Sequence, residues 1–169
     1  MYFSVGAKET LIKSVLQAIP IYAMSCFRIP KSICEEIERE CASFWWGIEQ
    51  GKRRLHWKIW RALCRPKCMG GLSFRHLETF NKALLAKHVW HIIIDSGSLL
   101  ARVLKAQYFR HHDIMDAPLG SNISYIWLSL LWSRLLLEKV YDGKWEMVQK
   151  LLPLGALDSR DVDPSVPPS

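Results

Sequence analysis

The side chains best suited to chemistry in this sequence are its five cysteines and six histidines, since thiolates and imidazoles are the usual ligands of zinc. Cys64 and Cys68 form one pair, with His56 eight residues before it and His76 eight residues after it. Structural zinc sites usually contain two closely spaced ligand pairs, and this sequence has a single loose one. The spacing therefore favours unligated thiols, and we expect no metal and no other cofactor.

A second cluster combines His111 and His112 with Asp113 and Asp116. Such side chains occur in hydrolases and metal sites, but catalysis also needs a nucleophile or further carboxylate in fixed geometry. The surrounding sequence predicts a loop, and no glycine-rich phosphate loop, nucleophile elbow or paired-aspartate motif accompanies it. We therefore expect a solvated loop, no catalytic residue and no enzymatic activity.

The strongest functional signal is a basic segment, defined here as residues 52–67, with seven Lys or Arg residues and no Asp or Glu. Basic side chains displace counterions from a phosphate backbone, and aromatic rings stack on unpaired bases. The pattern is equally typical of Trp57 and Trp60 anchoring a core while the charges keep a helix surface in solution. The residues expected to bind RNA or DNA are Lys52, Arg53, Arg54, Trp57, Lys58, Arg61, Arg65 and Lys67.

The composition is that of a globular chain. The sequence has 169 residues, of which 50% are hydrophobic and 23% charged, and its net charge is +7 at pH 7. A chain of this length buries about two-thirds of its unfolded surface, so one compact domain is expected without a metal or disulfide. The positive net charge indicates something about binding partners and solubility, and it does not predict the fold. An odd number of cysteines without a secretory leader predicts reduced thiols in an intracellular protein.

No segment predicts a membrane-spanning helix. The longest uncharged stretches, residues 14–27 and 117–133, contain Pro or Gly and fall short of the roughly 20 apolar residues that a span needs. We therefore expect no membrane partner. Lys8 and Lys13 near the N-terminus are compatible with a mitochondrial presequence.

Apolar residues recur at intervals of three and four along most of the chain, which predicts helices. The expected fold class is all-α, an irregular helical domain of about five helices with a disordered C-terminal tail. The first helix should begin near Lys8 and end or kink at Pro20, with one or two turns resuming over residues 21–27. Its apolar face should consist of Leu11, Val15, Ala18 and Ile19.

A second helix should begin at Ser32, because Ser32 and Glu35 have the spacing of a capping box, and should end at Gly47. Residues 48–54 predict an exposed loop, and a short helix containing Trp60 should follow. The apolar side of the second helix should consist of Ile33, Ile37, Cys41 and Phe44.

Three further helices are expected in the second half of the chain. They should cover residues 77–94, a segment capped by Ser98, and residues 124–141. The resulting organisation is a helical body over residues 1–140, a divergent segment over 141–157 and a disordered, proline-containing tail over 158–169.

Several short motifs together resemble one family. They resemble, in collinear order over about residues 4–139, the region that follows the polymerase core in plant LINE-type non-LTR retrotransposon reverse transcriptases. The motifs are KETLIKSVLQAIP at 8–20, FWWG at 44–47, HW at 56–57, LCRPK at 63–67, GGLSFR at 70–75, FNKALLAK at 80–87, RVLKA at 102–106, YF at 108–109, and Ser124, Tyr125 and Trp127.

The resemblance implies a fragment without a catalytic centre. In these elements the polymerase aspartates lie upstream, in a Tyr-x-Asp-Asp context, and a zinc-binding segment and often a ribonuclease H lie downstream. This sequence has no Asp before Asp95 and no Asp-Asp pair. Residues 140–145 match the family only in part, which indicates truncation or a changed reading frame. Related open reading frames occur in plant nuclear genomes and as plant mitochondrial proteins, so the nucleus and the mitochondrion are both expected compartments.

The resemblance also implies that this region follows the thumb and helps to hold template and primer. We therefore expect a non-catalytic fragment that binds RNA or DNA through the basic segment. Replacing Arg53, Arg54, Arg61 and Arg65 by Ala should weaken that binding and flatten its salt dependence. One alternative is a helical interaction module whose exposed apolar surface self-associates or binds a protein partner. Another is a translated relic without a nucleic-acid role.

Overall fold

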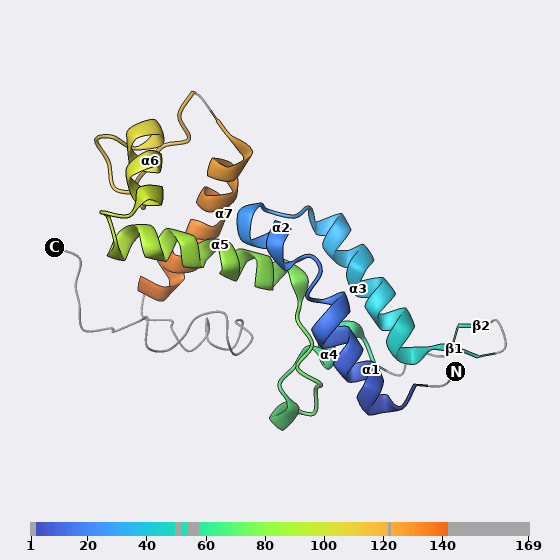
Figure 1. Ribbon diagram of the computed structural model, residues 1–169. Coiled ribbons are helices and arrows are strands. Elements are labelled where there is room, and N and C mark those ends of the chain that lie inside the picture. Colours follow the sequence, from blue (N-terminus) through green and yellow to red (C-terminus); the bar gives the residue numbers. More distant parts are fainter. Residues whose placement is uncertain (1–2, 50–51, 54–57, 122, 142–169) are drawn as a thin grey trace. The chain divides into compact units, whose positions relative to one another are not determined.

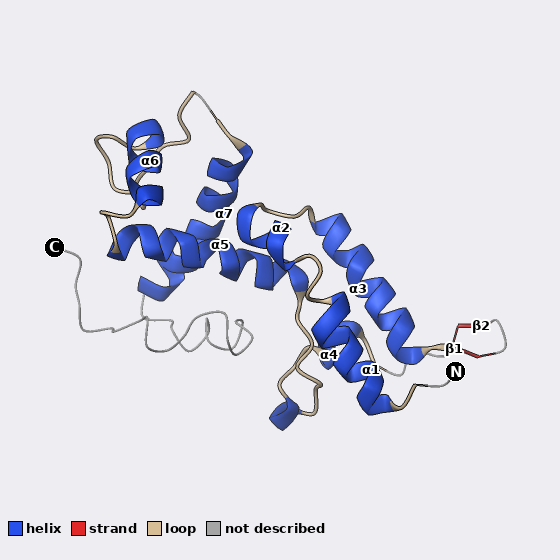
Figure 2. Cartoon of the chain, viewed as in Figure 1, coloured by secondary structure: helices blue, strands red, loops and turns tan. Residues whose placement is uncertain are grey.

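A computed structural model describes residues 3–49, 52–53, 58–121 and 123–141 of the chain (Figure 1). These residues form seven α-helices, which confirms the all-α fold class. Figure 2 shows the helices in blue and the turns and loops that connect them in tan. The two helices beyond the expected five are the turns that resume after Pro20 and the short helix containing Trp60, both of which the sequence predicted as short segments. The tail over residues 158–169 lies outside the described residues.

The chain divides into two compact units. Unit 1 comprises Met1–Asn81 and unit 2 comprises Lys82–Ser169. Each unit has its own cluster of buried apolar side chains. The border between them falls inside α5 (Leu77–Ile94), a helix whose sequence shows no break there.

Unit 1 begins with α1 (Val5–Leu11), followed by a π-helical turn, η1 (Ile12–Leu16), and by α2 (Ile21–Cys26). The hydroxyl of Ser4 caps α1 by accepting a hydrogen bond from the Ala7 N–H at 3.2 Å. Helix α2 confirms the predicted resumption after Pro20.

The π-helical turn corrects the predicted apolar face of the first helix. It is closed by the Gln17 N–H, which donates to the Ile12 carbonyl at 2.9 Å. A π-helical turn contains one more residue than an α-helical turn and so rotates the side chains that follow it. As a result Ile12 and Gln17 are buried, whereas Val15 and Ile19 are 44% and 73% exposed.

Helix α3 (Lys31–Trp46) starts one residue before Ser32, so the predicted capping box is wrong. Pro30 precedes the helix, since its ring fixes φ at a value compatible with a helix start. The carboxylate of Glu35 instead lies 3.6 Å from the Lys31 ammonium, one helical turn back. At the other end Gly47 terminates the helix with φ +79°, which confirms the predicted stop.

Two short strands follow α3 within the predicted loop over residues 48–54. Strand β1 (Ile48–Glu49) pairs antiparallel with β2 (Lys52–Arg53), and Ile48 lies opposite Arg53. The loop prediction is therefore wrong for these four residues, because their backbone groups pair with one another. Arg54 and the residues up to Trp57 lie outside the described residues.

The core of unit 1 gathers around the buried ring of Phe74. Trp45 meets this ring edge-on at 5.4 Å between centroids, and Trp60 stacks on it at 5.0 Å. Ile12, Cys41 and Leu63 are buried in the same cluster. Helix α3 lies beside α1 and α4 (Trp60–Leu63) around this core (Figure 1).

The side chain of Asn81 ties the connection between α2 and α3 to the start of α5. Its amide nitrogen donates to the carbonyls of Met24 and Phe27 at 2.6 and 2.8 Å, and its carbonyl accepts from the Ile29 N–H at 2.8 Å. Asn81 is fully buried. A buried amide with all these partners specifies one arrangement of the backbone around it.

Two further polar side chains make comparable long-range bonds. The amide of Gln17 pairs with the backbone of Arg75, donating to its carbonyl and accepting from its N–H, both at 3.2 Å. The Glu38 carboxylate accepts from the Leu77 N–H and so caps the first turn of α5. These hydrogen bonds give partners to backbone groups that folding would otherwise remove from water without a replacement.

Unit 2 contains most of α5 together with α6 (Leu99–Tyr108) and α7 (Tyr125–Tyr141), at the predicted places. Ser98 caps α6 by accepting from the Ala101 N–H at 3.3 Å, as predicted. Ser124 accepts in the same way from the Trp127 N–H at 3.1 Å. Among the described residues, no helix combines the length and apolar character needed to cross a membrane.

The core of unit 2 surrounds the indole of Trp127, which is fully buried. Tyr108 stacks on one side at 4.7 Å between centroids, and Phe109 lies parallel to it at 5.8 Å. The indole N–H donates to the Leu119 carbonyl at 3.2 Å. Helix α7 is thereby held to the end of α6 and to the loop between them.

Candidate nucleic-acid interface

The structure describes the side chains of four of the eight residues predicted to bind nucleic acid. Lys58, Arg61, Arg65 and Lys67 are all exposed. Lys52 and Arg53 lie in β2, where only the backbone is described. Arg54 and Trp57 lie outside the described residues.

Helix α4 sets the direction of Arg61, the first of the two exposed arginines. Its apolar residues Trp60 and Leu63 are one turn apart and enter the core beside Phe74. Arg61 lies in the helix and Arg65 lies two residues past its end, and both side chains are exposed. Trp60 is therefore a core anchor, and its ring is not presented to a base.

The turn after α4 folds back onto the helix and fixes Arg65. The Leu72 N–H donates to the Leu63 carbonyl at 2.8 Å, and the Ser73 N–H donates to the Arg65 carbonyl at 2.9 Å. A 3-10 turn, η2 (Lys67–Met69), leads into Gly70, whose φ of +76° is the left-handed conformation. The sequence predicted a turn here but not this return to α4.

Gly71 makes the return possible. A Cβ atom at this position would lie 2.0 Å from the carbonyl oxygen of Arg65 and 2.8 Å from its Cα. Both atoms belong to the main chain and cannot move aside by a change of rotamer. The exposed position of Arg65 thus depends on a glycine that the sequence marked only as a turn residue.

Lys67 differs from the arginines because it has an acidic partner. Its ammonium lies 2.9 Å from the Glu9 carboxylate, which also binds the Lys13 ammonium at 2.7 Å. Within the described part of the chain, Arg61 and Arg65 have no such ion pair, so their charges remain available to an anion. Only the Glu9–Lys13 pair, four residues apart, could have been found from spacing.

Two carboxylates of unit 1 have pKa values shifted in opposite directions. Hydrogen bonds from Lys13 and Lys67 lower the pKa of Glu9 below its usual 4.5. Burial raises the pKa of Glu38, with nearby Glu35 and Glu78 acting in the same direction; the Leu77 N–H and His76 oppose it.

These shifts predict opposite effects of two glutamine substitutions. Glu9→Gln should destabilise the protein above about pH 4.5 and have no effect in acid, since a lowered pKa gives stability that is lost as pH falls. Glu38→Gln should stabilise it at neutral pH, because a raised pKa costs stability as pH rises, and glutamine still accepts from Leu77. Urea unfolding between about pH 3 and 7 measures both effects. Parallel pH profiles for the two variants would contradict the assignment.

The cysteine and histidine residues do not form a metal site in the described part of the chain. No group of three or more His, Cys, Asp or Glu side chains there is arranged to hold an ion. Burial raises the pKa of Cys34 and Cys41 to about 11 and that of Cys64 to about 12, which keeps these thiols protonated. His56 lies outside the described residues.

The histidines between α6 and α7 belong to an exposed loop, as predicted. His111, His112, Asp113 and Asp116 are all exposed. The loop is anchored by Ile114, whose buried side chain belongs to the core of unit 2. The four polar side chains therefore face solvent.

The chain is similar to plant proteins. No protein-family model matches it, and no solved structure matches it. It is 33% identical over 105 residues to a candidate ribonuclease H protein of Arabidopsis thaliana, covering 62% of this chain but only 17% of that relative. It is 39% identical over 150 residues to an uncharacterized mitochondrial protein of the same plant, covering 80% of this chain and 97% of the relative. The chain belongs to the family of this Arabidopsis mitochondrial protein.

Proposed function

We propose that this chain is a non-catalytic fragment of a LINE-type non-LTR retrotransposon reverse transcriptase that binds RNA or DNA through its basic segment. The motifs from residue 8 to residue 127 support the parentage. So does the similarity to a small part of a longer candidate ribonuclease H protein, because a ribonuclease H often follows this region in such elements. The name of the other relative favours a mitochondrial over a nuclear location.

The observation that carries the binding proposal is the exposed pair Arg61 and Arg65. Arg61 lies in α4 and Arg65 in the bend that follows it, so the two exposed charges are four residues apart in the chain. Lys58 lies before α4, three residues from Arg61, and is exposed, its ammonium 3.4 Å from the Gly70 carbonyl. Three exposed cations within eight residues, without an acidic partner among the described residues, suit a phosphate backbone.

The role in this proposal is to hold a strand, not to process it. The polymerase aspartates of the parent family have no counterpart, since the first Asp of this chain is Asp95. Trp60 packs against Phe74, so the described part of the basic segment offers charge without a stacking ring. Binding should therefore be electrostatic and largely independent of base sequence.

The test compares the purified chain with a variant in which Arg53, Arg54, Arg61 and Arg65 are replaced by Ala. Binding to a fluorescent single strand and to a primer–template duplex is measured at about 50 and about 200 mM salt. Four lost contacts should reduce the slope of log affinity against log salt by about 2.8 for the single strand. A control variant replaces exposed Lys31 and Arg39 of α3 by Ala and should leave the slope unchanged. Equal slopes for the wild type and the four-arginine variant would reject the basic segment.

An interaction module is the second candidate, favoured by exposed apolar side chains in unit 1. Val15, Ile19 and Tyr22 are 44%, 73% and 83% exposed. Such side chains are unusual on a monomer when they form a continuous patch. Light scattering on the same samples distinguishes the two functions: a monomer that binds the strand supports the first, and association without strand binding supports the second.

A further inference from the structure

Helix α6 has one face in the core of unit 2 and one in solvent. Ala101 and Leu104 are buried, and Tyr108 stacks on Trp127. This spacing of three and four residues accounts for the inward face. The remaining residues of the helix are therefore directed outward.

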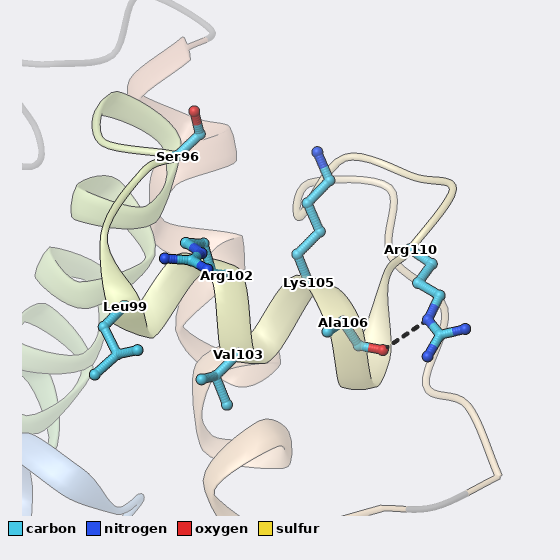
Figure 3. A pocket seen from close by; sticks show the side chains of 7 residues that line it. All are labelled: Ser96, Leu99, Arg102, Val103, Lys105, Ala106 and Arg110. Carbon is cyan, nitrogen blue, oxygen red and sulfur yellow. Dashed lines mark hydrogen bonds between the residues drawn. The ribbon is translucent and has the colours of Figure 1, made fainter.

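The outward face contains a pocket of about 540 Å³ that is widely open to solvent (Figure 3). Three basic side chains line it, Arg102, Lys105 and Arg110, together with Ser96. Figure 3 shows that the cations come from α6 and the residues just after it. No acidic side chain is among the lining residues.

These three side chains account for every exposed Lys or Arg among the described side chains of unit 2. Two half-buried cations of the unit make contacts within it. Lys82 lies over the Trp132 ring at 5.2 Å, and Arg134 donates to the carbonyls of Ile114 and Ala117. The exposed Lys and Arg side chains that the structure describes in this unit thus all line one pocket.

The cations of the pocket are available to an anion. Among the described residues none of the three forms an ion pair, and the Arg110 guanidinium uses one nitrogen, Nε, to donate to the Ala106 carbonyl at 3.0 Å (Figure 3). Arg102 and Lys105 are about 4.5 Å apart along the helix axis, close to the spacing of about 3.4 Å per nucleotide in one B-form strand.

We infer that this pocket binds phosphate groups of a nucleic-acid strand and is a second contact in unit 2, apart from the basic segment of unit 1. The inference shares with the proposed function the class of partner, but it rests on different residues. Leu99 and Val103, 76% and 56% exposed, border the cations and offer apolar contact to sugars. The pocket thereby combines charge for the phosphates with apolar surface for the rest of the backbone.

The experiment uses three variants of the full chain, each losing two positive charges. They are Arg102→Gln with Lys105→Gln, Arg61→Gln with Arg65→Gln, and the control Lys31→Gln with Arg39→Gln. Binding of a fluorescent single strand is measured at about 50 and about 200 mM salt. The pocket variant should show a salt slope smaller by about 1.4, so that added salt weakens its binding about sevenfold less than that of the wild type.

A charge-retaining variant, Arg102→Lys with Lys105→Arg, should keep the wild-type slope and show that the glutamine variant has lost charge, not structure. An unchanged slope in the pocket glutamine variant would overturn the inference. So would loss of binding to phosphatidylserine vesicles without any change in strand binding, since that would identify an anionic membrane as the partner.

The two assignments fail in different ways. If only the Arg61 and Arg65 variant changes the slope, the proposed function stands and the pocket inference fails. If only the pocket variant changes it, the pocket is the binding site and the basic segment is rejected. A wild-type chain that binds no strand at either salt concentration rejects both.

Discussion

Trp127→Ala should lower the free energy of unfolding by about 3–5 kcal/mol, the range for removing a large buried aromatic side chain. Trp127 is fully buried, and its ring is parallel to those of Tyr108 and Phe109. The truncation removes this aromatic contact and leaves the Leu119 carbonyl without its indole donor. Urea unfolding followed by far-UV circular dichroism measures the loss.

Two variants separate the contributions of Trp127. Trp127→Phe keeps an aromatic ring but loses the hydrogen bond to Leu119, so its cost should lie between those of wild type and alanine. Ile126→Ala, next in sequence and 45% exposed, should cost less than about 1 kcal/mol. Equal costs for Ile126→Ala and Trp127→Ala would contradict a core centred on this indole.

Gly71→Ala should cost about 3 kcal/mol, the upper end of the usual range for forcing an atom into filled space. The added Cβ would overlap the Arg65 carbonyl oxygen, at 2.0 Å, and the turn can relieve this only by moving its main chain. The bonds from Leu72 to Leu63 and from Ser73 to Arg65 would then lengthen or break. Thermal unfolding of the variant measures the cost.

Gly70→Ala is the matched control, since the adjacent residue has open space around it. No atom lies within 4 Å of a Cβ placed on Gly70, but its φ is +76°. Alanine there should cost about 1–2 kcal/mol from left-handed strain alone. A Gly71→Ala variant as stable as the wild type would show that the turn does not pack against Arg65.

The helices that the sequence predicted well are those with a regular apolar periodicity or a capping residue at one end. The apolar periodicity gave the bounds of α5, and Ser98 and Ser124 marked the starts of α6 and α7. Gly47 ended α3 because its backbone has a positive φ, a conformation that glycine adopts readily and other residues do not.

The features that the sequence did not predict depend on distant residues. The π-helical turn buries Gln17, and this is favourable because Gln17 pairs with Arg75, 58 residues away. The division into two units inside α5 has no local signal either, since neither Gly nor Pro interrupts the helix at Asn81.

The sequence predicted which residue types make up the candidate site but not how they are arranged in space. Seven basic residues within residues 52–67 identified the segment, but their spacing did not show that Lys67 pairs with Glu9. Nor did it decide between a stacking and an anchoring role for Trp60, which depends on the position of Phe74. The sequence did not indicate the cations of α6 and the residues just after it as a site, because these charges are spread over nine residues.

The long-range bonds of Gln17, Glu38 and Asn81 have a consequence for biosynthesis. All three join residues of the first half of unit 1 to partners between residues 75 and 81. A nascent chain that has not yet reached Asn81 leaves the Met24 and Phe27 carbonyls without their amide donor. Translation must therefore pass Asn81, the second residue of the motif FNKALLAK, before unit 1 can close. Ribosome pausing upstream of that point would leave the helices of unit 1 exposed to chaperones and proteases.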